Sequence, residues 1–572
     1  MRTQSMLLVL AVAIVLSACA GNAVYEPTSA RKPSPDYYGT LEPFASDAVY
    51  FVMTDRFVNG DRSNDQRDQG KDKGAAFSTF DRPVTGAPAG KHANVGYLGG
   101  DFKGIAEHAE YIRQMGFSAV WITPIVDNPD EAFTGGDPVI WGGSFTDGGK
   151  TGFHGYWGDN FYVIDEHLPS PGLDFRGFTT AMRGHGLKVV LDIVCNHGSP
   201  AYTMPRDQPK FGKIYDANWT LLADHQDLPP ARLDPARNPL HAWYNTGGGL
   251  AQLSDINENN PAVLEYFVGA YSQWIDQGAA AFRIDTIPWM PHAYWHAFVQ
   301  RIRAKHPGFF MFGEAFDYDA GKIAEHTLPQ NAGVSVLDFP LKKAIAATFE
   351  TPGSDYAALA EPLHLTGGPY QNPYDLMTFY DNHDMARMNA SDNGFIDAHN
   401  WLFTARGIPV IYYGSEVGFE RGTAEHAGNR NYFGAEGIAL AKAHPIHAAL
   451  AHIAKVREAS PALQRGLQLN LELQGDRAAF YRVYQHDGVQ QVALVLLNKG
   501  DTSQRFSIRD MLQAGAWRSA MERNPVDVAA GATLDADVPA HGVKVFLLDA
   551  PVTEPGLLEA LDAAMAGARR AQ

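Results

Sequence analysis

Eight short apolar runs, rich in β-branched and aromatic residues, recur along most of the chain, and each has the length of a buried strand. Amphipathic stretches lie between several of them, and at 105–115 and 263–275 their apolar residues repeat at helical spacing. Repeated alternation of strand and helix predicts an α/β fold, a (β/α)8 (TIM) barrel. The expected strands cover residues 49–53, 119–122, 189–194, 280–284, 309–312, 334–337, 377–380 and 410–413.

Two long stretches interrupt this alternation. Residues 127–173, after the second strand, are rich in Gly, Asp and aromatic residues and predict a long loop over the mouth of the barrel. Residues 198–258, after the third strand, are rich in Pro, Asn and Asp and predict an inserted subdomain. From about residue 463 short alternating strands follow without helices, which predicts an antiparallel β-sandwich over 463–550. A terminal helix is expected at 557–571.

The N-terminus has the pattern of an export signal. Arg2 precedes an apolar stretch of about eleven residues, too short to span a bilayer. The stretch ends in Leu16-Ser17-Ala18-Cys19, which resembles a bacterial lipoprotein signal with Cys19 as the acylated residue. Ordinary cleavage after Ala20 is the alternative. Because Ala20 and not Asp follows the cysteine, we expect an outer-membrane lipoprotein facing the periplasm or the cell surface, and otherwise a periplasmic or secreted protein.

These patterns divide the chain into consecutive parts. A Pro-rich tether is expected between the signal and the barrel. The expected parts are a signal peptide at 1–18, a tether at 19–43, the first part of the barrel at 44–197, the inserted subdomain at 198–258, the second part of the barrel at 259–462, the β-sandwich at 463–550 and a tail at 551–572.

Composition narrows the class of protein. The 572 residues, 45% hydrophobic, allow two or three domains with large cores. A net charge of −18 without a basic cluster excludes nucleic acid and anionic membrane surfaces as partners, so membrane contact is expected only through a lipid on Cys19, and the protein is expected to be a monomer. The other cysteine, Cys195, lies in an apolar strand and is interpreted as a core residue, so no intramolecular disulfide is expected.

Polar, ionisable residues end four of the predicted strands, at 192–197, 282–285, 312–314 and 379–384. Three of these ends supply carboxylates, namely Asp285, Glu314 and Asp384. Carboxylates that converge at strand ends can break a glycosidic bond through an oxocarbenium-like transition state. Each one alone could equally be a helix cap or a structural ion pair, but the joint pattern favours catalysis.

The four strand ends resemble the signature regions of the α-amylase family of glycoside hydrolases, over nearly all of residues 45–550. Residues 54–61 (Thr-Asp-Arg-Phe-Val-Asn-Gly-Asp) and 99–105 (Gly-Gly-Asp-Phe-Lys-Gly-Ile) are most similar to the bacterial branch that contains cyclodextrin glucanotransferases, cyclodextrinases and related α-amylases. The resemblance implies an α-glucan substrate and a retaining mechanism.

The resemblance also implies a role for each carboxylate. Asp285 would be the nucleophile that forms a covalent glucosyl intermediate, and Glu314 the general acid and then the base. In a retaining mechanism these carboxyl groups lie about 5–5.5 Å apart. The apolar run before Glu314 is expected to raise its pKa, as an acid catalyst requires. Asp384 would bind the 2- and 3-hydroxyls of the sugar.

Further side chains are assigned to the substrate. Arg283 lies two residues before Asp285 and shares its face of the strand, so it can hold the nucleophile ionised. Asp192 is expected to be a structural partner of Arg283. A lone histidine is more often a satisfied core residue, but the resemblance places two on the sugar hydroxyls and a tyrosine against the sugar ring. The expected substrate-binding residues are Tyr156, His197, Arg283, His383, Trp157, His154 and Trp289.

Calcium is the expected metal. An acidic loop is usually only solvated, but the resemblance places one group of hard oxygen donors on a calcium loop, namely Asn59, Asp61, Asn64, Asp65, Gly99 and Asp101. A second site would use Asn196 and Asp255. At the position where the family has Lys-His after the nucleophile this chain has Pro288-Trp289, and the family's histidine supplies only a backbone carbonyl to that site.

Two departures from the family bear on the reaction. Pro288-Trp289 rebuilds the acceptor side, with Trp289 available for stacking. Ala251 stands where cyclising transferases carry the Tyr or Phe around which a glucan curls, and no starch-binding module is expected after the sandwich. We therefore expect an α-1,4-glucan hydrolase acting on starch, maltooligosaccharides or cyclodextrins. A glucanotransferase and a catalytically inactive glucan-binding lipoprotein are the alternatives.

Overall fold

Eight parallel strands form the centre of the protein, seen in a computed structural model that describes residues 35–89, 91–92, 94–205, 208–522 and 524–569. Neighbouring strands follow the order β12-β11-β10-β5-β2-β1-β14-β13, and a parallel bridge between Leu337 and Met377 links the first to the last. All eight predicted strands are confirmed, and so is the barrel. They are β1 (Val49–Val52), β2 (Ala119–Ile122), β5 (Lys188–Ile193), β10 (Ala279–Ile284), β11 (Phe310–Gly313), β12 (Ser335–Val336), β13 (Met377–Thr378) and β14 (Ile408–Tyr412).

The barrel strands are apolar along their whole length because both of their faces are buried. All four residues of β1 and all four of β2 are buried. Inside the barrel the Phe51 and Trp121 rings stack at 3.8 Å, and the Trp121 ring meets Phe312 edge-on at 5.5 Å. These side chains fill the interior of the barrel, so a ligand can bind only at the ends of the strands.

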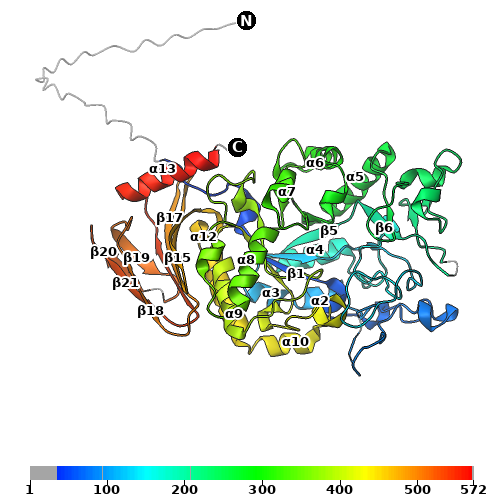
Figure 1. Cartoon of the computed structure of the whole chain (residues 1–572), viewed down its shortest axis with the longest axis horizontal. Helices are drawn as coiled ribbons and strands as arrows, with labels where there is room; N and C mark the ends of the chain where they lie inside the picture. The colour runs from blue at the N-terminus through cyan, green and yellow to red at the C-terminus, as the bar shows by residue number, and fades with distance from the viewer. Residues whose placement is uncertain (1–34, 90, 93, 206–207, 523, 570–572) are drawn as a thin grey trace, which may run out of the picture. The chain divides into compact units, whose positions relative to one another are not determined.

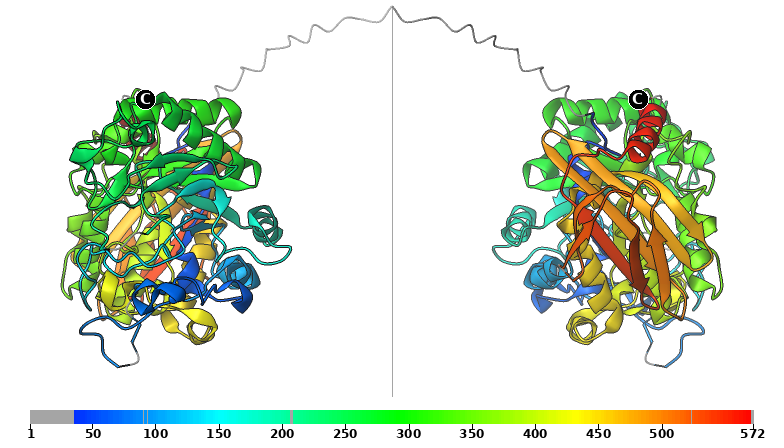
Figure 2. Two further views of the ribbon diagram at one scale, coloured as in Figure 1. Left: turned by 90° about the vertical axis from the view of Figure 1, so that its right-hand side faces the viewer. Right: turned by 90° about the vertical axis from the view of Figure 1, so that its left-hand side faces the viewer.

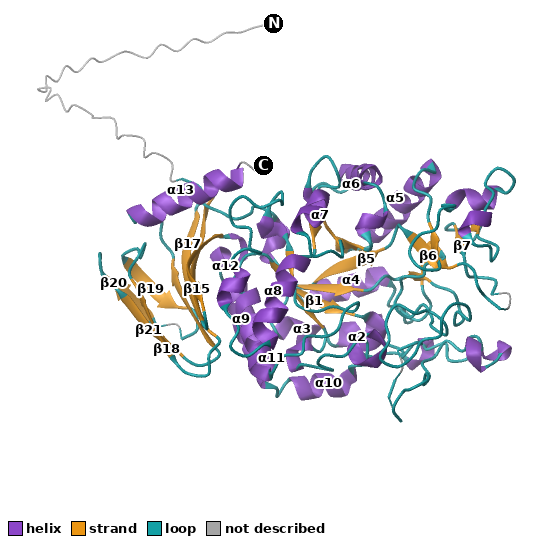
Figure 3. Cartoon of the chain, viewed as in Figure 1, coloured by secondary structure: helices purple, strands orange, loops and turns teal. Residues whose placement is uncertain are grey.

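Helices surround the barrel (Figures 1 and 3). The helix predicted at 263–275 is confirmed as α5 (Pro261–Asp276), which begins after the Asn260 cap. The helical stretch predicted at 105–115 is confirmed but divided, because the backbone at His108 leaves helical geometry and separates α2 (Phe102–Glu107) from α3 (Ala109–Gln114). The other helices of this part are α1 (Thr54–Phe57), α4 (Phe175–Gly184), α6 (His292–Lys305), α7 (Ala320–Ala324), α8 (Phe339–Glu350), α9 (Asp392–Leu402), α10 (Gly434–Ala441), α11 (Pro445–Glu458) and α12 (Pro461–Arg465).

The two stretches that interrupt the alternation contain short hairpin-like pairs. Strand β3 (Val126–Asp127) pairs with β4 (Asn160–Ile164) within the long loop after β2. After β5, β6 (His197–Pro200) pairs with β9 (Leu253–Asp255), and β7 (Lys213–Tyr215) pairs with β8 (Leu221–Asp224). Many bends and 3-10 turns connect them, in agreement with the Pro, Asn and Asp content.

The C-terminal part is antiparallel, as predicted (Figure 2). A six-stranded sheet of order β15-β16-β17-β22-β19-β20 accompanies a two-stranded sheet, β18-β21, and the side chains between them form a separate apolar core. The strands are β15 (Leu467–Gln474), β16 (Arg477–His486), β17 (Val489–Asn498), β18 (Gln504–Ile508), β19 (Gly515–Ser519), β20 (Pro525–Val528), β21 (Leu534–Val538) and β22 (Gly542–Leu548), followed by α13 (Pro555–Arg569).

The last residues of the tether predicted at 19–43 belong to the packed part of the protein. Tyr37 is buried, pairs with Gln485 through the backbone and donates a 2.8 Å hydrogen bond to Asp562. The tether is therefore wrong for its last residues, because an aromatic ring anchors them in the β-sandwich. Cys19 and the signal peptide lie outside the described residues. Within those residues, no helix combines the length and the hydropathy needed to cross a bilayer.

Candidate active site

A cavity of about 310 Å³ opens at the carboxyl ends of the barrel strands, where the polar strand ends meet. Nine of the predicted site residues line it: His154, Tyr156, Trp157, His197, Asp285, Trp289, Glu314, His383 and Asp384. Trp157 is nearly buried and packs mainly against Phe133 and Phe211, whereas the Trp289 side chain is 54% exposed. A second cavity of about 180 Å³ adjoins the first, and both are lined by Thr286, Trp289, Glu314 and Phe316.

Arg283 lies beneath the cavity and contacts both carboxylates predicted to act on the bond. Its Nη1 donates to Asp285 Oδ1 at 2.7 Å, and its Nη2 lies 2.8 Å from Glu314 Oε1. Nη1 also donates to Asp192 Oδ1 at 2.9 Å, which agrees with the structural role predicted for that residue. The guanidinium is fully buried. One fixed cation thus orients three carboxyl groups that come from different strands.

Asp192 receives two further hydrogen bonds. Tyr156 donates its hydroxyl at 2.8 Å and Trp121 its indole N–H at 3.1 Å, both to Oδ2. Burial raises the pKa of Asp192 to about 7, against the lowering effect of Arg283. These contacts fix the Tyr156 ring over the cavity, where it could support a sugar ring.

Glu314 has the environment of a proton donor. Its carboxyl group is buried at the end of β11, and burial raises its pKa to about 8, while Arg283 lowers it and Asp384 and Asp285 raise it further. A buried carboxyl beside other carboxylates is stabilised in its neutral form. Glu314 can therefore carry a proton at neutral pH, which the predicted role of general acid requires.

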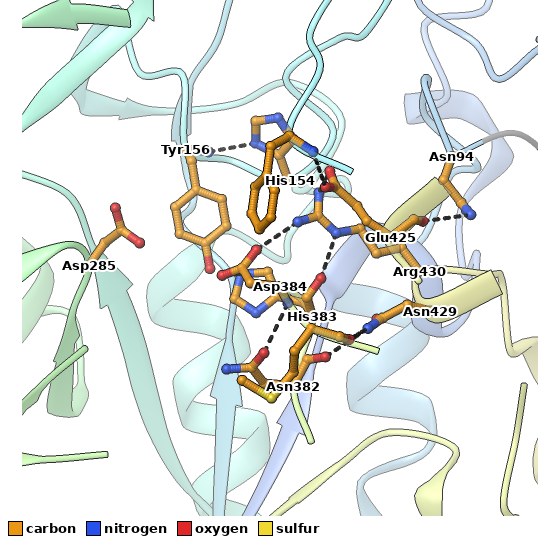
Figure 4. A network of polar contacts seen from close by, with 12 residues as sticks. Asn94, His154, Tyr156, Asp285, Asn382, His383, Asp384, Glu425, Asn429 and Arg430 are labelled. Carbon is orange, nitrogen blue, oxygen red and sulfur yellow. Dashed lines mark hydrogen bonds and ion pairs between the residues drawn. The ribbon is translucent and has the colours of Figure 1, made fainter. Parts of the chain in front are cut away.

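Asp384 is held by two neighbours, Arg430 and His383 (Figure 4). Arg430 donates to its Oδ1 at 2.7 Å, and His383 Nε2 lies 3.1 Å from Oδ2. The His383 and Tyr156 rings are stacked, with centroids 5.4 Å apart and planes at 11°. Burial lowers the pKa of His383 well below its ordinary value, so the imidazole is neutral and can exchange hydrogen bonds with hydroxyl groups.

His197 completes the group around Asp285. Its Nε2 lies 4.0 Å from Asp285 Oδ2, and burial lowers the pKa of the ring. Thr286, the residue after Asp285, has φ +45°, an uncommon conformation for a residue branched at Cβ. Strained backbone of this kind is concentrated at functional sites, and here it directs the chain away from β10 immediately after the carboxylate.

Comparison with known proteins agrees with this arrangement. Residues 51–438 match the family described as alpha amylase, catalytic domain, which is more than half of the chain. The chain belongs to the α-amylase family.

Relatives in the family include both transferases and hydrolases. A cyclomaltodextrin glucanotransferase from Bacillus licheniformis is 27% identical over 517 residues, which cover 86% of this chain and 65% of that protein. An α-amylase from Niallia circulans is 28% identical over 479 residues, covering 80% of this chain and 81% of that one. The crystal structure of CldA, described as the first cyclomaltodextrin glucanotransferase with a three-domain ABC distribution, has a TM-score of 0.71 at 27% identity and covers 88% of this chain and 99% of that chain.

The sequence did not single out several charged and aromatic residues of the α-amylase site. Lys150 and Glu425 line the cavity with a 3.0 Å ion pair, and Arg430 pairs with Glu425 at 2.9 Å. None of them follows an apolar run that marks a strand, so no local signal identified them. Further lining residues that the prediction missed are Phe145, Asp147, Leu250, Leu253 and Phe316.

The predicted calcium loop brings its donors together. Asn59 Nδ2 lies 2.6 Å from Asp65 Oδ1, and Asn64 Nδ2 lies 3.3 Å from Asp101 Oδ2. Asp101 also caps α2 through Gly104, whereas Asp61 is only partly buried and caps a 3-10 turn. Oδ1 of Asn59 and Oδ1 of Asn64 are buried without a hydrogen-bond partner among the described residues. Buried oxygens left without a partner in a set of hard donors fit a calcium ion.

Gly99 packs directly against two donors of this loop. A Cβ at Gly99 would lie 2.2 Å from Asn59 Nδ2 and 2.5 Å from Asp65 Oδ1, so only glycine fits next to these donors. At the second predicted site, the Asn196 carbonyl accepts from Ile256 N at 2.9 Å, which places Asn196 beside Asp255 across β6 and β9.

Proposed function

We propose that the protein is a retaining α-glucan hydrolase that cleaves α-1,4-glucosidic bonds in starch, maltooligosaccharides or cyclodextrins. The observation that carries the proposal is the Arg283 guanidinium, which contacts Asp285 at 2.7 Å and Glu314 at 2.8 Å within one cavity. Two carboxyl groups on one cation lie close together, as a nucleophile and an acid must in a retaining mechanism. An inactive glucan-binding protein would not need this arrangement.

In the proposed first step, the protonated Glu314 gives its proton to the glycosidic oxygen while Asp285 attacks the anomeric carbon. The bond to the leaving sugar breaks, and a covalent glucosyl ester forms on Asp285. In the second step Glu314, now ionised, takes a proton from water as the water attacks the same carbon, and the ester bond to Asp285 breaks, which releases the sugar and restores the Asp285 carboxylate. Arg283 stabilises whichever of the two carboxyl groups is ionised at each stage, because it is buried and always ionised.

The remaining residues of the site would bind the sugar that is attacked. Tyr156 is fixed by its hydrogen bond to Asp192 and would stack on the ring of that sugar. Asp384 is held by Arg430, and its carboxylate would accept hydrogen bonds from two sugar hydroxyls. His197 and His383 would bind further hydroxyls in the neutral form. Hydrogen bonds that strengthen at the transition state supply rate acceleration.

Hydrolysis is favoured over cyclisation by the residue at position 251. Ala251 lines the cavity with φ +50° and has no ring around which a glucan could curl back toward Asp285. The relatives favour the alternative, a cyclodextrin glucanotransferase or another 4-α-glucanotransferase, since several of them carry that activity. The three-domain CldA matches over 99% of its length, so the number of domains does not separate the two activities.

Product analysis on maltoheptaose, soluble starch and β-cyclodextrin tests the proposal. We expect linear, chiefly short maltooligosaccharides from starch, with water or a short sugar as acceptor. Cyclodextrins as the dominant early product would support the transferase instead. Absence of cleavage of any α-glucan by the purified protein would contradict both.

We further propose that calcium occupies the loop formed by Asn59, Asp61, Asn64, Asp65, Gly99 and Asp101, and that Asn196 and Asp255 contribute to a second site. Calcium in these loops would stabilise the ends of β1 and the inserted subdomain, which carry no catalytic carboxylate. The metal would thus contribute to stability and not to the chemical steps.

The proposed location follows from the N-terminus. An acyl chain on Cys19 would anchor an exported monomer to the outer membrane and leave the barrel free to meet its substrate. Metabolic labelling with a radioactive fatty acid tests this proposal, and loss of the label in the Cys19→Ser variant is the expected control result.

A further inference from the structure

The loop after β2 is joined to the segment after β14 at the carboxyl ends of the barrel strands. Two backbone hydrogen bonds make this connection, from Gly142 N to His426 O at 3.1 Å and from His426 N to Gly143 O at 3.2 Å. Phe145 N adds a third by donating to Glu425 Oε2 at 3.1 Å. We call the joined residues 140–150 and 425–431 the wall.

Glu425 is the electrostatic centre of the wall. Its Oε1 lies 3.0 Å from Lys150 Nζ and 2.9 Å from Arg430 Nη1, and all three side chains are about 95% buried. Although burial opposes it, Arg430 and Lys150 hold the pKa of Glu425 well below its ordinary value. A buried carboxylate with two cations and a backbone donor is costly to separate, so the wall is a rigid part of the site.

The wall stands on one side of the barrel. Strands β2, β1 and β14 are neighbours, so loops after β2 and β14 that meet must pass over the end of β1. Strands β10 and β11, which end at Asp285 and Glu314, lie in another part of the barrel. Arg430 connects the wall to the site, because it pairs with Asp384 as well as with Glu425 (Figure 4).

The direction of the substrate follows from the roles of the carboxylates. Glu314 protonates the oxygen of the leaving sugar, so that sugar must lie on its side of the bond, where the second cavity is lined by Trp289, Phe316 and Asp317. The attacked sugar lies between Asp285, Tyr156 and Asp384. The remainder of the donor chain, toward its non-reducing end, must then continue from Asp384 toward Arg430, Glu425 and Lys150.

We propose that the wall closes the donor end of the cleft, so that the enzyme binds the non-reducing end of a glucan and releases short products from it. The proposal rests on the function proposed above. Phe145, Asp147, Lys150, Glu425 and Arg430, all of the wall, line the cavity, so the wall bounds it beyond Asp384. Lys150 and Glu425 are then the residues that set where the chain must end.

Glucans with a blocked end test this proposal directly. The substrate is p-nitrophenyl maltoheptaoside, either free or with an ethylidene group on the 4- and 6-hydroxyls of its non-reducing end. The enzyme should cleave the blocked form about 100-fold more slowly, because the added group collides with the wall. β-Cyclodextrin, which has no end, should also be cleaved more slowly than maltoheptaose, so that among the substrates proposed above the linear ones are preferred.

Two variants should open the wall. In Lys150→Met the side chain keeps its length but loses the ion pair with Glu425. In the second variant two glycines replace residues 140–147, and the stem remains because Val139 N bonds to Gly148 O at 3.0 Å and Gly148 N to Asp137 O at 2.9 Å. Either variant should reduce the preference for the free-ended substrate by about tenfold or more. The second keeps the test valid if the first does not fold.

Lys213→Met is the matched control, since Lys213 pairs with Asp224 at 3.7 Å on the β7–β8 hairpin and does not line the cavity. It should keep the full preference for the free end. Equal rates on blocked and free substrates in the unmodified enzyme, or an unchanged preference in the folded wall variants, would overturn the proposal. Failure to cleave either substrate would instead overturn the proposed function.

Discussion

Arg283 donates a 2.7 Å hydrogen bond to the carboxylate of Asp285, two residues further along the same strand end. Side chains two residues apart in a strand point to the same face, so this contact is a direct result of the local sequence. The contact of the same guanidinium with Glu314 joins β10 to β11 and depends on the barrel. One cation thereby links a local arrangement to a tertiary one.

Replacement of either carboxylate that is proposed to be catalytic should abolish activity without unfolding the protein. Asp285→Asn and Glu314→Gln are nearly isosteric but remove the nucleophile or the proton donor, and each should lower kcat by about 10⁴-fold or more. Hydrolysis of maltoheptaose and the melting curve of each variant are the measurements. Asp276→Asn, at the end of α5 and exposed, serves as the control. Several per cent of residual activity in either variant would contradict the assigned roles.

The Arg283→Lys variant should separate the effect of the positive charge from the effect of the planar arrangement of hydrogen-bond donors. The lysine keeps a positive charge but cannot reach Asp285, Asp192 and Glu314 with a planar fork, so kcat should fall by about 100-fold. Because Arg283 lowers the pKa of Glu314, loss of that contact should also move the alkaline limb of the pH profile upward. A purely structural role would leave this limb in place. Arg301→Lys, which changes an exposed ion pair with Glu265, is the matched control.

The pH profile should report the proton on Glu314. Its pKa is raised by burial to about 8, so the acid form persists at neutral pH and is lost as pH rises through that value. The rate kcat/KM should therefore decline above about pH 8 and remain high at pH 7. Measurement of kcat/KM between pH 5 and pH 10 checks the prediction. A decline that begins near the ordinary pKa of glutamate would show that Glu314 is not the acid.

Chelation should lower the melting temperature. If calcium binds the native loop around Asn59 and Asn64, removing it costs the free energy of ligand binding, and returning calcium restores it. Differential scanning calorimetry with and without chelator measures the effect, and magnesium should restore less because it requires a smaller octahedral site. The Asp65→Asn variant should respond less to chelation. An unchanged melting curve in excess chelator would argue against an exchangeable ion.

Much of the fold could be predicted because its signals are local. Strands buried on both faces must be apolar along their length, so all eight barrel strands were readable from short runs. The β-sandwich after residue 463 could also be predicted, because its strands are short alternating runs without helices between them. The break at His108 within the helical stretch 105–115 could not be predicted, because the apolar spacing continues through this residue although the helical backbone does not.

Some residues of the candidate site could likewise be predicted from the local sequence, and others could not. Asp285, Glu314 and Asp384 follow apolar runs and could be found without the structure. Arg430 and Glu425 follow no such run, and Lys150 lies in an irregular loop about 275 residues away from its partner. Ion pairs over such separations carry no periodic signal, so only the closed barrel reveals which charges meet.

The sequence by itself determined the barrel, the β-sandwich and the carboxylates at the strand ends. A strand that is buried on both faces needs an apolar residue at each position, so the strands and the polar residues that end them are visible in the sequence. Only the tertiary structure decided how those carboxylates are oriented and which charged residues surround them. Arg283 reaches Asp192, Asp285 and Glu314 from β10, and Glu425 gathers Lys150 and Arg430, through contacts between segments that are distant along the chain. Such contacts depend on chain closure and burial, which no short stretch of residues encodes.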